Sequence, residues 1–198
     1  NDVAIPEVPE SSDQQAINVF KRQSELEASY WSIEKRYAPF ININDRKGQV
    51  LIKDFLWRIT EELGEAIEAQ NNMEEITKVH EELADALHVV TGLCVITDRG
   101  LVFKAGWSDS VNSPNLVKIN TLEREVVEAL SKVGNCLKMK PWKQTDMSTD
   151  EGYFDLCLHD LVVVYLNYCF ARGLNNEWLY QYYMRKSEVN LFRIRSKY

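Results

Sequence analysis

Four carboxylates stand in two evenly spaced pairs, Glu62 with Glu65 and Glu82 with Asp85. Residues three apart share one face of a helix, with Cβ atoms about 5–6 Å apart. Two such pairs on antiparallel helices would direct four negative charges into one small volume, where repulsion favours protonation. A hard cation relieves that repulsion, and Mg²⁺ takes oxygen ligands and bridges carboxylates to substrate phosphates. The spacing therefore indicates a divalent-cation site.

The same acids also fit a solvated surface, because Glu is a strong helix former and acidic runs usually face water. Nine acids and one base lie between Glu61 and Asp85, a net charge of −8 against −7 for the whole chain. The four paired carboxylates differ from the rest because they border two apolar stripes, where acids are unusual unless paired or metal-bound. The stripes comprise Phe55, Ile59, Leu63, Ala66 and Ile67, and then Ile76, Val79, Leu83, Leu87 and Val90. Spacing alone leaves both interpretations open.

A second set of polar residues, near the carboxyl end, has the chemistry to bind phosphate. Lys186, Asn190 and Arg193 lie at positions i, i+4 and i+7, on one face of a helix. Lys and Arg supply charged donors for phosphate oxygens, and Asn adds a neutral donor for phosphate or sugar. Basic residues are also favoured in the last turns of any helix, where they face water. The pattern fits a phosphate-binding face or a solvated terminal helix.

The elements that position these residues belong to one domain. A chain of 198 residues can bury a sizeable core, and 45% hydrophobic with 27% charged residues is typical of a soluble globular protein. We expect the domain to cover residues 12–198, after a flexible, proline-containing tail over residues 1–11. A pI near 5.1 argues against binding to nucleic-acid polymers or to anionic membranes.

Four cysteines lie in apolar helical segments without any C-x-x-C spacing, at Cys94, Cys136, Cys157 and Cys169. We expect them to be reduced and buried, and a zinc site is not indicated. The amino-terminal residues show no apolar leader segment, and the longest apolar run is too short to span a bilayer. These features predict a cytoplasmic protein without a membrane partner.

Apolar residues recur with helical periodicity along the chain, and no stretch alternates as a strand does. We therefore predict an all-α bundle of about six helices. The expected helices cover about 12–37, 49–70, 73–96, 113–137, 151–171 and the residues from about 176 onward. Residues 101–111, which contain Gly106 and a polar cluster, are expected to form a loop, as are residues 140–150. The helix over 151–171 is the most apolar and is expected to be central.

Polar residues mark where these helices begin. Ser12 is the expected N-cap of the first helix, and Asn175 or Asn176 that of the last. Asp45 to Gly48 are expected to form a turn before the second helix. The buried face of the first helix is expected to comprise Ile17, Phe20, Leu26 and Ile33.

The two acidic pairs, separated by a helix-to-helix turn, resemble the all-α nucleoside triphosphate pyrophosphohydrolases of the MazG-like superfamily. The segment YMRKSEVNLFR, from Tyr183 to Arg193, is similar to the Tyr-x-x-Lys-x-x-x-Asn-x-x-Arg segment of its dimeric dUTPase and phage dCTPase–dUTPase branch. His88, three residues after Asp85, also fits that branch. The resemblance covers most of residues 20–95 and 150–198.

The resemblance implies an all-α homodimer that hydrolyses a deoxynucleoside triphosphate to the monophosphate and pyrophosphate. It implies Mg²⁺, or Mn²⁺ in its place, as the cofactor. The residues matched to metal ligands are Glu62, Glu65, Glu82 and Asp85, and those matched to phosphate or sugar contacts are Lys186, Asn190 and Arg193. Glu62 would also orient the attacking water as general base, without a covalent intermediate.

The base-binding residues depart from the family pattern. The family segment Gln-x-x-Leu-Asn corresponds to residues Gln23 to Glu27, with Glu in place of the Asn that contacts uracil. An ionised Glu only accepts hydrogen bonds and so suits the amine of cytosine better than uracil O4. The resemblance favours dUTP as substrate, with dCTP or another dNTP as the alternative. His88 could contact the nucleotide or simply pack, and Trp142 could stack on the base or cover the core.

Two rival classes fit parts of the pattern. A di-iron carboxylate bundle needs a Glu-x-x-His pair on each of two helices, and only Asp85-x-x-His88 approaches that motif. A non-catalytic helical interaction module would carry the same acids on its surface. Pyrophosphate release from dNTPs with Mg²⁺ separates the enzyme from both.

Overall fold

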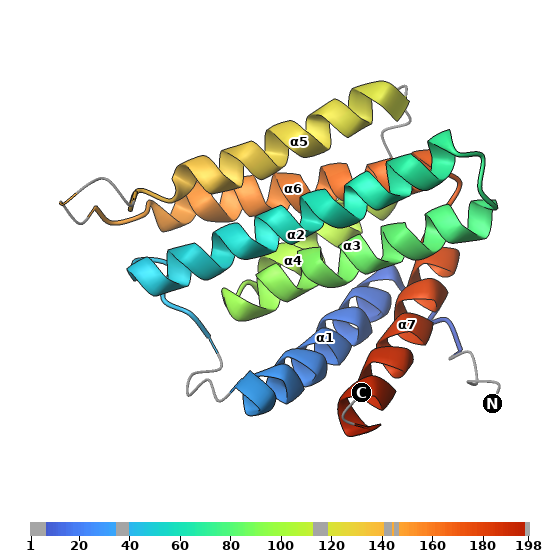
Figure 1. The fold of residues 1–198 in the computed structure, drawn as a ribbon, viewed down its shortest axis with the longest axis horizontal. Coiled ribbons are helices and arrows are strands. Elements are labelled where there is room, and N and C mark those ends of the chain that lie inside the picture. Colours follow the sequence, from blue (N-terminus) through green and yellow to red (C-terminus); the bar gives the residue numbers. More distant parts are fainter. Residues whose placement is uncertain (1–6, 35–39, 113–118, 141–143, 145–146, 197–198) are drawn as a thin grey trace.

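The computed structural model describes residues 7–34, 40–112, 119–140, 144 and 147–196 (Figure 1). Its helices are α1 (Ser12–Glu34), α2 (Arg46–Asn71), α3 (Ile76–Ile96), α4 (Gly100–Asn112), α5 (Ile119–Cys136), α6 (Glu151–Ala171) and α7 (Asn176–Ser196). No strand occurs in these ranges. The predicted all-α architecture is confirmed, with seven described helices in place of about six.

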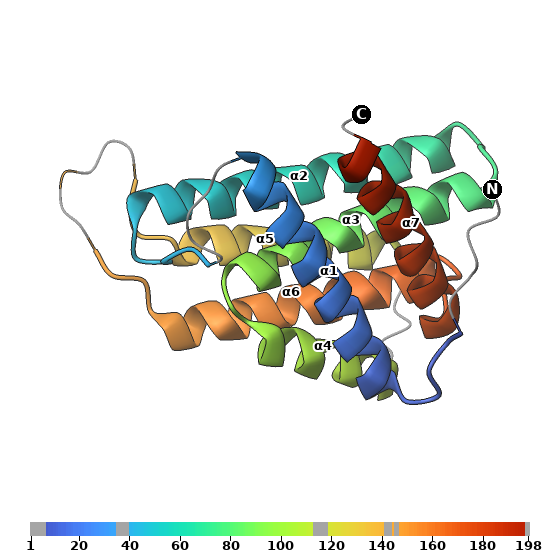
Figure 2. The same cartoon turned by 90° about the horizontal axis from the view of Figure 1, so that it is seen from below.

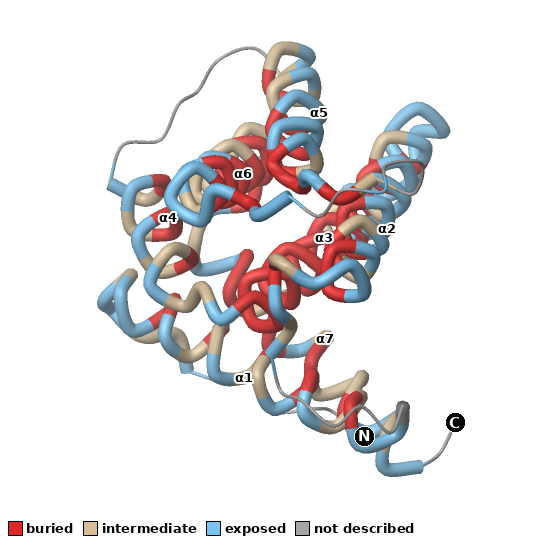
Figure 3. The backbone as a smooth tube through the Cα atoms, turned by 90° about the vertical axis from the view of Figure 1, so that its left-hand side faces the viewer, coloured by how far each residue is buried: buried red, intermediate tan, exposed pale blue. Residues whose placement is uncertain are grey.

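Helix α3 lies at the centre of the bundle, in contact with α1, α2, α4, α6 and α7. Figure 1 shows α2, α3, α5 and α6 extending along the long axis, and Figure 2 shows α1 and α7 crossing α3. Every residue of α3 from Ala86 to Ile96 is buried, which Figure 3 draws in red. The apolar α6 packs mainly against α4 and α5, so the central helix is α3 and not the one we expected.

The stretch around Gly106, predicted to be a loop, forms helix α4. Phe103 and Trp107 lie one turn apart on this helix, and both side chains are fully buried. Gly106 permits the close approach of α6, because a Cβ there would lie 2.8 Å from Cγ1 of Val162. The Ser110 hydroxyl donates to the Gly106 carbonyl at 2.7 Å, so it is satisfied within the helix. The residues that indicated a loop are packing residues of a helix.

Helix ends fall close to their predicted positions, with small shifts. Asp45 accepts a hydrogen bond from an amide in the first turn of α2, so this helix begins inside the predicted turn. Asn175 caps α7 in the same way, and Ser11 rather than Ser12 caps α1. Helix α3 begins three residues late, because Met73 has φ 55°, which is incompatible with a right-handed helix. The predicted end of the first helix and start of the fourth lie outside the described residues.

The predicted apolar stripes of α2 and α3 are buried, except for the partly buried Ile67 and for Ile76, which is 59% exposed. On α1 the prediction is confirmed for Leu26 and wrong for Ile17 and Ile33, whose side chains face solvent. Helix α1 crosses the bundle and packs against α3, α4 and α7 (Figure 2). Its buried face is therefore set by where it crosses these helices and not by its own periodicity.

The four cysteines are buried and free, as predicted. Helix α6 carries two of them and is the one described helix long and apolar enough to cross a membrane. In the bundle, 56% of that apolar stretch is buried, largely against α4 and α5. Packing in the core accounts for its composition.

Candidate functional site

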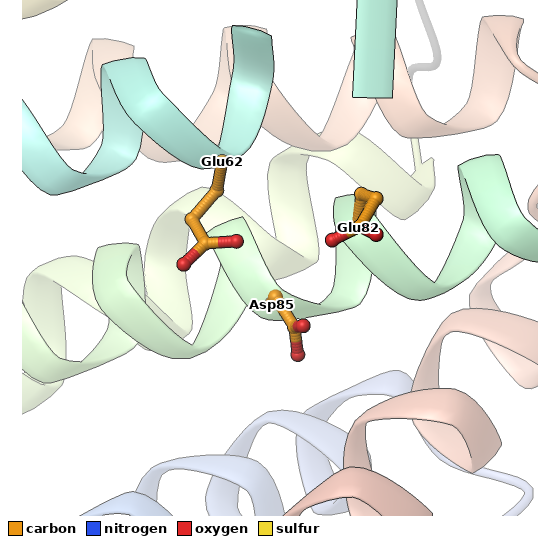
Figure 4. Close-up of side chains that lie close together, drawn as sticks. All are labelled: Glu62, Glu82 and Asp85. Atoms are coloured by element: carbon orange, nitrogen blue, oxygen red, sulfur yellow. The ribbon is translucent and has the colours of Figure 1, made fainter. Parts of the chain in front are cut away.

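Three of the four predicted metal ligands converge between α2 and α3 (Figure 4). One carboxylate oxygen from each of Glu62, Glu82 and Asp85, here called the acid triad, lies within 4.8 Å of the other two. Oxygens on opposite sides of an Mg²⁺ ion lie about 4.2 Å apart, twice the ~2.1 Å bond. The triad is therefore close to the spacing of a shared cation, and its oxygens are the donors that a hard cation prefers.

The fourth predicted ligand, Glu65, lies beside the acid triad and not within it. Its side chain is exposed on α2, one turn after Glu62. It lines a depression of about 300 Å³ together with Lys78 and Glu82. Its negative charge is one of the causes that raise the pKa of Glu62. Glu65 thus lies outside the acid triad but contributes to the negative electrostatic potential that its residues experience.

Two lysines offset part of the triad's charge. Lys78, one turn before Glu82 on α3, forms an ion pair with it at 2.7 Å, but its side chain is half exposed and the pair is therefore weak. Lys186 on α7 donates to Oδ2 of Asp85 at 2.6 Å. The residue predicted to bind phosphate thus reaches the acid triad from a helix more than 100 positions away in the sequence.

The acid triad concentrates negative charge in a partly buried place, which a bound cation would neutralise. Burial raises the pKa of Glu62 to about 7, helped by the charges of Asp85, Glu65 and Glu82 and opposed by Lys186. Burial also raises the pKa of Asp85, against the lowering effect of its bond to Lys186. A carboxylate with a pKa near neutrality can accept a proton from water and release it again.

A cavity of about 340 Å³ lies where α1, α2, α3 and α7 meet. This volume falls in the range of small-molecule pockets, roughly 300–1,000 Å³. The lining residues are Gln23, Leu26, Glu27, Tyr30, Phe55, Arg58, His88, Val89 and Asn190. Three of the predicted base-binding residues and the predicted sugar or phosphate contact Asn190 therefore line a single cavity.

The cavity and the acid triad are neighbouring parts of one site. On α3, the cavity residue His88 follows Asp85 by three positions, and on α7, Asn190 follows Lys186 by four. Helix α2 repeats the pattern, because Arg58 lies in the cavity one turn before the triad residue of that helix. One helical turn rises about 5.4 Å, so the two parts are about that far apart along each helix.

A buried hydrogen-bonded chain joins α7 to α1 at the cavity. The Tyr183 hydroxyl donates to Oε1 of Gln23 at 2.5 Å, and Nε2 of Gln23 donates to Oε1 of Glu27 at 3.0 Å. Gly92 on α3 leaves the space for this chain, because a Cβ there would lie 2.7 Å from Oε1 of Glu27. The chain holds Glu27 as a hydrogen-bond acceptor in the cavity wall.

His88 is both a packed side chain and a cavity residue. Its ring stacks on Tyr183 with centroids 3.9 Å apart and an interplanar angle of 6°. Nδ1 lies 2.8 Å from the carbonyl oxygen of Ala84, which can only accept, so Nδ1 carries the ring proton. Burial lowers the pKa of His88 to about 4, so the ring is neutral and Nε2 is an acceptor. Nε2 is buried without a hydrogen-bond partner among the described residues.

Of the two remaining predicted residues, one lies at the edge of the site and the other lies outside the described residues. Arg193 is exposed near the end of α7. Burial and Glu27 raise the pKa of the cavity residue Tyr30, and Arg58 and Arg193 lower it, which puts Arg193 in electrostatic reach of the cavity. Trp142 lies outside the described residues.

Sequence reasoning missed several residues of this site. Tyr30, Phe55 and Arg58 line the cavity, and Lys78 pairs with the acid triad. Their residue types are common on helices, and their spacing carries no signal. Gly92, a glycine inside an apolar helical run, was the one available sign that another helix approaches closely there.

No protein-family model matches the chain, and no curated protein or solved structure does. The functional inference therefore depends on the chemistry of the acid triad, the two lysines and the cavity. Oxygen donors at near-cation spacing fit a divalent ion, and a buried amide, carboxylate and imidazole fit a polar ring in the cavity.

Proposed function

We propose that this protein hydrolyses a deoxynucleoside triphosphate to the monophosphate and pyrophosphate with a divalent cation, Mg²⁺ or Mn²⁺. The observation that carries the proposal is that the acid triad on α2 and α3, with Lys186 on α7, lies one helical turn from the cavity. In a nucleotide, the base and sugar are joined directly to the phosphates. A ligand with its base and sugar in the cavity would therefore extend its phosphates toward the triad and Lys186.

The acid triad would hold the cation, with Glu65 one turn along α2 as a further carboxylate. When bound there, a divalent cation would clamp phosphate oxygens and lower the pKa of the attacking water. The positive charge of a bound ion would offset the electrostatic repulsion between the carboxylates of Glu62, Glu82 and Asp85.

The chain's own residues would orient the substrate and move the proton. Glu62 would accept a proton from the attacking water at a carboxylate oxygen, because a positioned carboxylate beside the reacting phosphate can act as a general base. Lys186 would exchange its bond to Asp85 for a phosphate oxygen. Asn190 would contact the sugar or a phosphate from the cavity wall, and Arg193 would approach the phosphates from the edge.

The resemblance to the dimeric dUTPase branch favours dUTP as the substrate, with dCTP or another dNTP as the alternative. Gln23 and Glu27, the residues matched to the uracil-contacting segment, line the cavity. Their presence there supports base recognition by this pair.

The test is pyrophosphate release from each of the four common dNTPs and dUTP, with Mg²⁺, with Mn²⁺ and with EDTA. We expect cation-dependent release of equal amounts of pyrophosphate and monophosphate from at least one of them. Glu62→Gln and Asp85→Asn should each lower kcat by about 100-fold or more, the usual effect of removing one electrostatic contact to the reacting group. Glu61→Gln, an exposed neighbour on α2, is the matched control and should leave kcat unchanged.

Failure of all five nucleotides to release pyrophosphate would overturn the proposal and favour the non-catalytic helical module. Release of orthophosphate in place of pyrophosphate would also overturn it. Glu65→Gln discriminates further: a loss as large as that of Asp85→Asn places Glu65 among the ligands of the bound ion. A loss below about tenfold leaves Glu65 as a neighbouring charge only.

A further inference from the structure

We propose that Tyr165 and His80 are positioning residues of the acid triad, which hold the turn of α3 that carries Glu82 and Asp85 against α6. The inference rests on the proposed function only for a divalent cation at the triad. Two hydrogen bonds that join α3 to α6 carry it, and neither involves the side chain of a proposed ligand. It gives α6, which contributes no residue to the cavity or the triad, a part in the site.

The first anchor is the hydroxyl of Tyr165. The side chain of Tyr165 is fully buried on α6, and its hydroxyl donates to the carbonyl oxygen of Leu83 at 2.5 Å. Leu83 lies between Glu82 and Asp85 in the chain, so this bond fixes the backbone from which both carboxylates project. A carbonyl oxygen has two lone pairs and can accept this bond in addition to a bond within the helix.

The second anchor is the ring of His80, which lies three residues before Leu83 and therefore on the same face of α3. Nε2 of His80 lies 3.1 Å from the carbonyl oxygen of Arg172, the residue that caps the end of α6. Because a carbonyl only accepts, Nε2 is the donor. The His80 ring also contacts Tyr182 of α7 edge to face, with ring centroids 5.8 Å apart. His80 is thereby held between α6 and α7.

The first turns of α3 receive little support from the helix itself. The N-cap residue, Glu75, makes no side-chain hydrogen bond to the helix, and residues 76–78 are exposed. A helix end without a cap or a packed face tends to fray. Repulsion within the acid triad also favours separation of α3 from α2. The bonds from α6 oppose both effects, so they preserve the oxygen spacing on which cation binding depends.

The experiment is calorimetric titration of the nucleotide-free chain with Mn²⁺. Tyr165→Phe keeps the ring and removes the hydroxyl, and His80→Phe keeps a ring against Tyr182 and removes the donor. We expect each to raise the Kd for Mn²⁺ by about tenfold or more, as substitution of residues that orient metal ligands does. Turnover lost at low Mn²⁺ should return at saturating Mn²⁺, and KM for the nucleotide should be unchanged, because neither residue lines the cavity.

Tyr180→Phe is the matched control, because it also removes the hydroxyl of a buried tyrosine, one that accepts from Asn18 at 3.2 Å. It loses a bond between α1 and α7 and should keep the wild-type Kd. His80→Gln places an amide N–H at about the reach of Nε2 and should restore most of the affinity lost in His80→Phe. Urea unfolding in EDTA should show similar losses of stability for Tyr165→Phe and Tyr180→Phe, so stability would not explain a difference in Kd.

Wild-type Mn²⁺ affinity in both Tyr165→Phe and His80→Phe would overturn the inference, as would an equal loss of affinity in Tyr180→Phe. A Kd for His80→Gln as high as that of His80→Phe would overturn the role of the His80 donor. If Tyr165→Phe fails to fold, His80→Phe, at a partly exposed position, retains the test.

The outcome is separable from that of the proposed function. Weaker Mn²⁺ binding in the two variants, without pyrophosphate release from any nucleotide, keeps the positioning residues and removes the enzyme. Pyrophosphate release with a Kd for Mn²⁺ that neither substitution changes keeps the enzyme and removes the positioning residues. A wild-type chain that binds no Mn²⁺ overturns both.

Discussion

At the scale of single residues, burial and neighbouring charges shift the pKa values of two side chains in the site away from their ordinary values. Glu62, on the border of a buried helix face, has its pKa raised to about 7 chiefly by burial and then by its acidic neighbours. His88 is held neutral by burial, with its pKa lowered to about 4. Glu62 belongs to the acid triad and His88 lines the neighbouring cavity, so both altered side chains belong to the candidate site.

The pH dependence of stability tests this account of Glu62. A carboxyl whose pKa is higher in the folded state binds its proton more tightly there, so its contribution to stability is present below pH 4.5 and lost as pH rises through 7. Glu62→Gln should therefore increase the free energy of unfolding of the metal-free protein, more at pH 8 than at pH 5. Because the group is partly solvated, the gain at pH 8 should be on the order of 1 kcal/mol.

Urea unfolding in EDTA at the two pH values gives the measurement, with Glu61→Gln as the control. A gain of equal size at both pH values would show that the charge of Glu62 is not its cause. Saturating Mg²⁺ should reverse the order at pH 8, because only the wild type keeps all the carboxylates that we propose as ligands of the ion.

At the scale of elements, the site depends on the crossing of α7 and α1 over α3. Helix α7 delivers Lys186 to Asp85 and Asn190 to the cavity, and α1 delivers Gln23 and Glu27. Ridges of packed side chains set such crossings, and small residues allow the closest ones. Gly92 has this role beneath α1, and Gly106 has it between α4 and α6.

Substitutions on α7 test its part in binding phosphate. Lys186→Ala and Arg193→Ala should each lower kcat/KM by roughly 10- to 150-fold, corresponding to ~1.5–3 kcal/mol for a charge-assisted hydrogen bond. Arg195→Ala, on an exposed turn of the same helix, is the matched control and should change little. Wild-type kinetics in both variants would contradict phosphate binding by α7 and would favour the alternative of a solvated terminal helix.

Packing of α4 against α6 is tested by Gly106→Val. The Cβ alone would lie 2.8 Å from Val162, so the helices must separate, which typically costs about 1–3 kcal/mol of unfolding free energy. Gly64→Val is the control, because no atom lies within 4 Å of a Cβ at that helical position. Chemical unfolding should show a loss for Gly106→Val alone; an equal loss for Gly64→Val would show that the close approach to Val162 is not the cause.

At the scale of the whole molecule, a single bundle leaves large aromatic side chains in solvent. Trp57, Trp178 and Phe192 are 63%, 56% and 70% exposed, and the ring of Trp178 lies tilted against that of Tyr182 with centroids 6.3 Å apart. Exposed aromatic residues are enriched at interfaces between proteins. The homodimer that the resemblance implies would cover residues of this kind, and it stays a prediction.

We predict a solution mass of twice the 23.0 kDa of one chain by light scattering at micromolar concentration. Trp57→Gln and Trp178→Gln, made separately, should show which face carries the contact, because loss of an interfacial aromatic anchor raises the dissociation constant by about tenfold or more. The mass of a single chain in the wild type would contradict the prediction.

The helices and the candidate ligands could be predicted because their signals are local. Apolar periodicity depends on 3.6 residues per turn, and it identified the core faces of α2 and α3 and the burial of all four cysteines. The three-residue spacing placed Glu82 and Asp85 on one face of α3, and the matched spacing on α2 placed Glu62 at the same border. Local geometry therefore indicated a cation site before any packing was known.

The composition of the acid triad, the α4 helix and the cavity depend on how the helices pack. No local sequence pattern predicts where helices cross or how each is rotated about its axis. Helix packing put Glu65 outside the acid triad, although Glu65 and Glu62 have the same spacing as the pair on α3. It turned the stretch around Gly106 into a helix packed on the core by one face, since burial of Phe103 and Trp107 outweighs weak helix propensity. It joined α1, α3 and α7 around a cavity whose acceptors, Glu27 and His88, are far apart in the sequence.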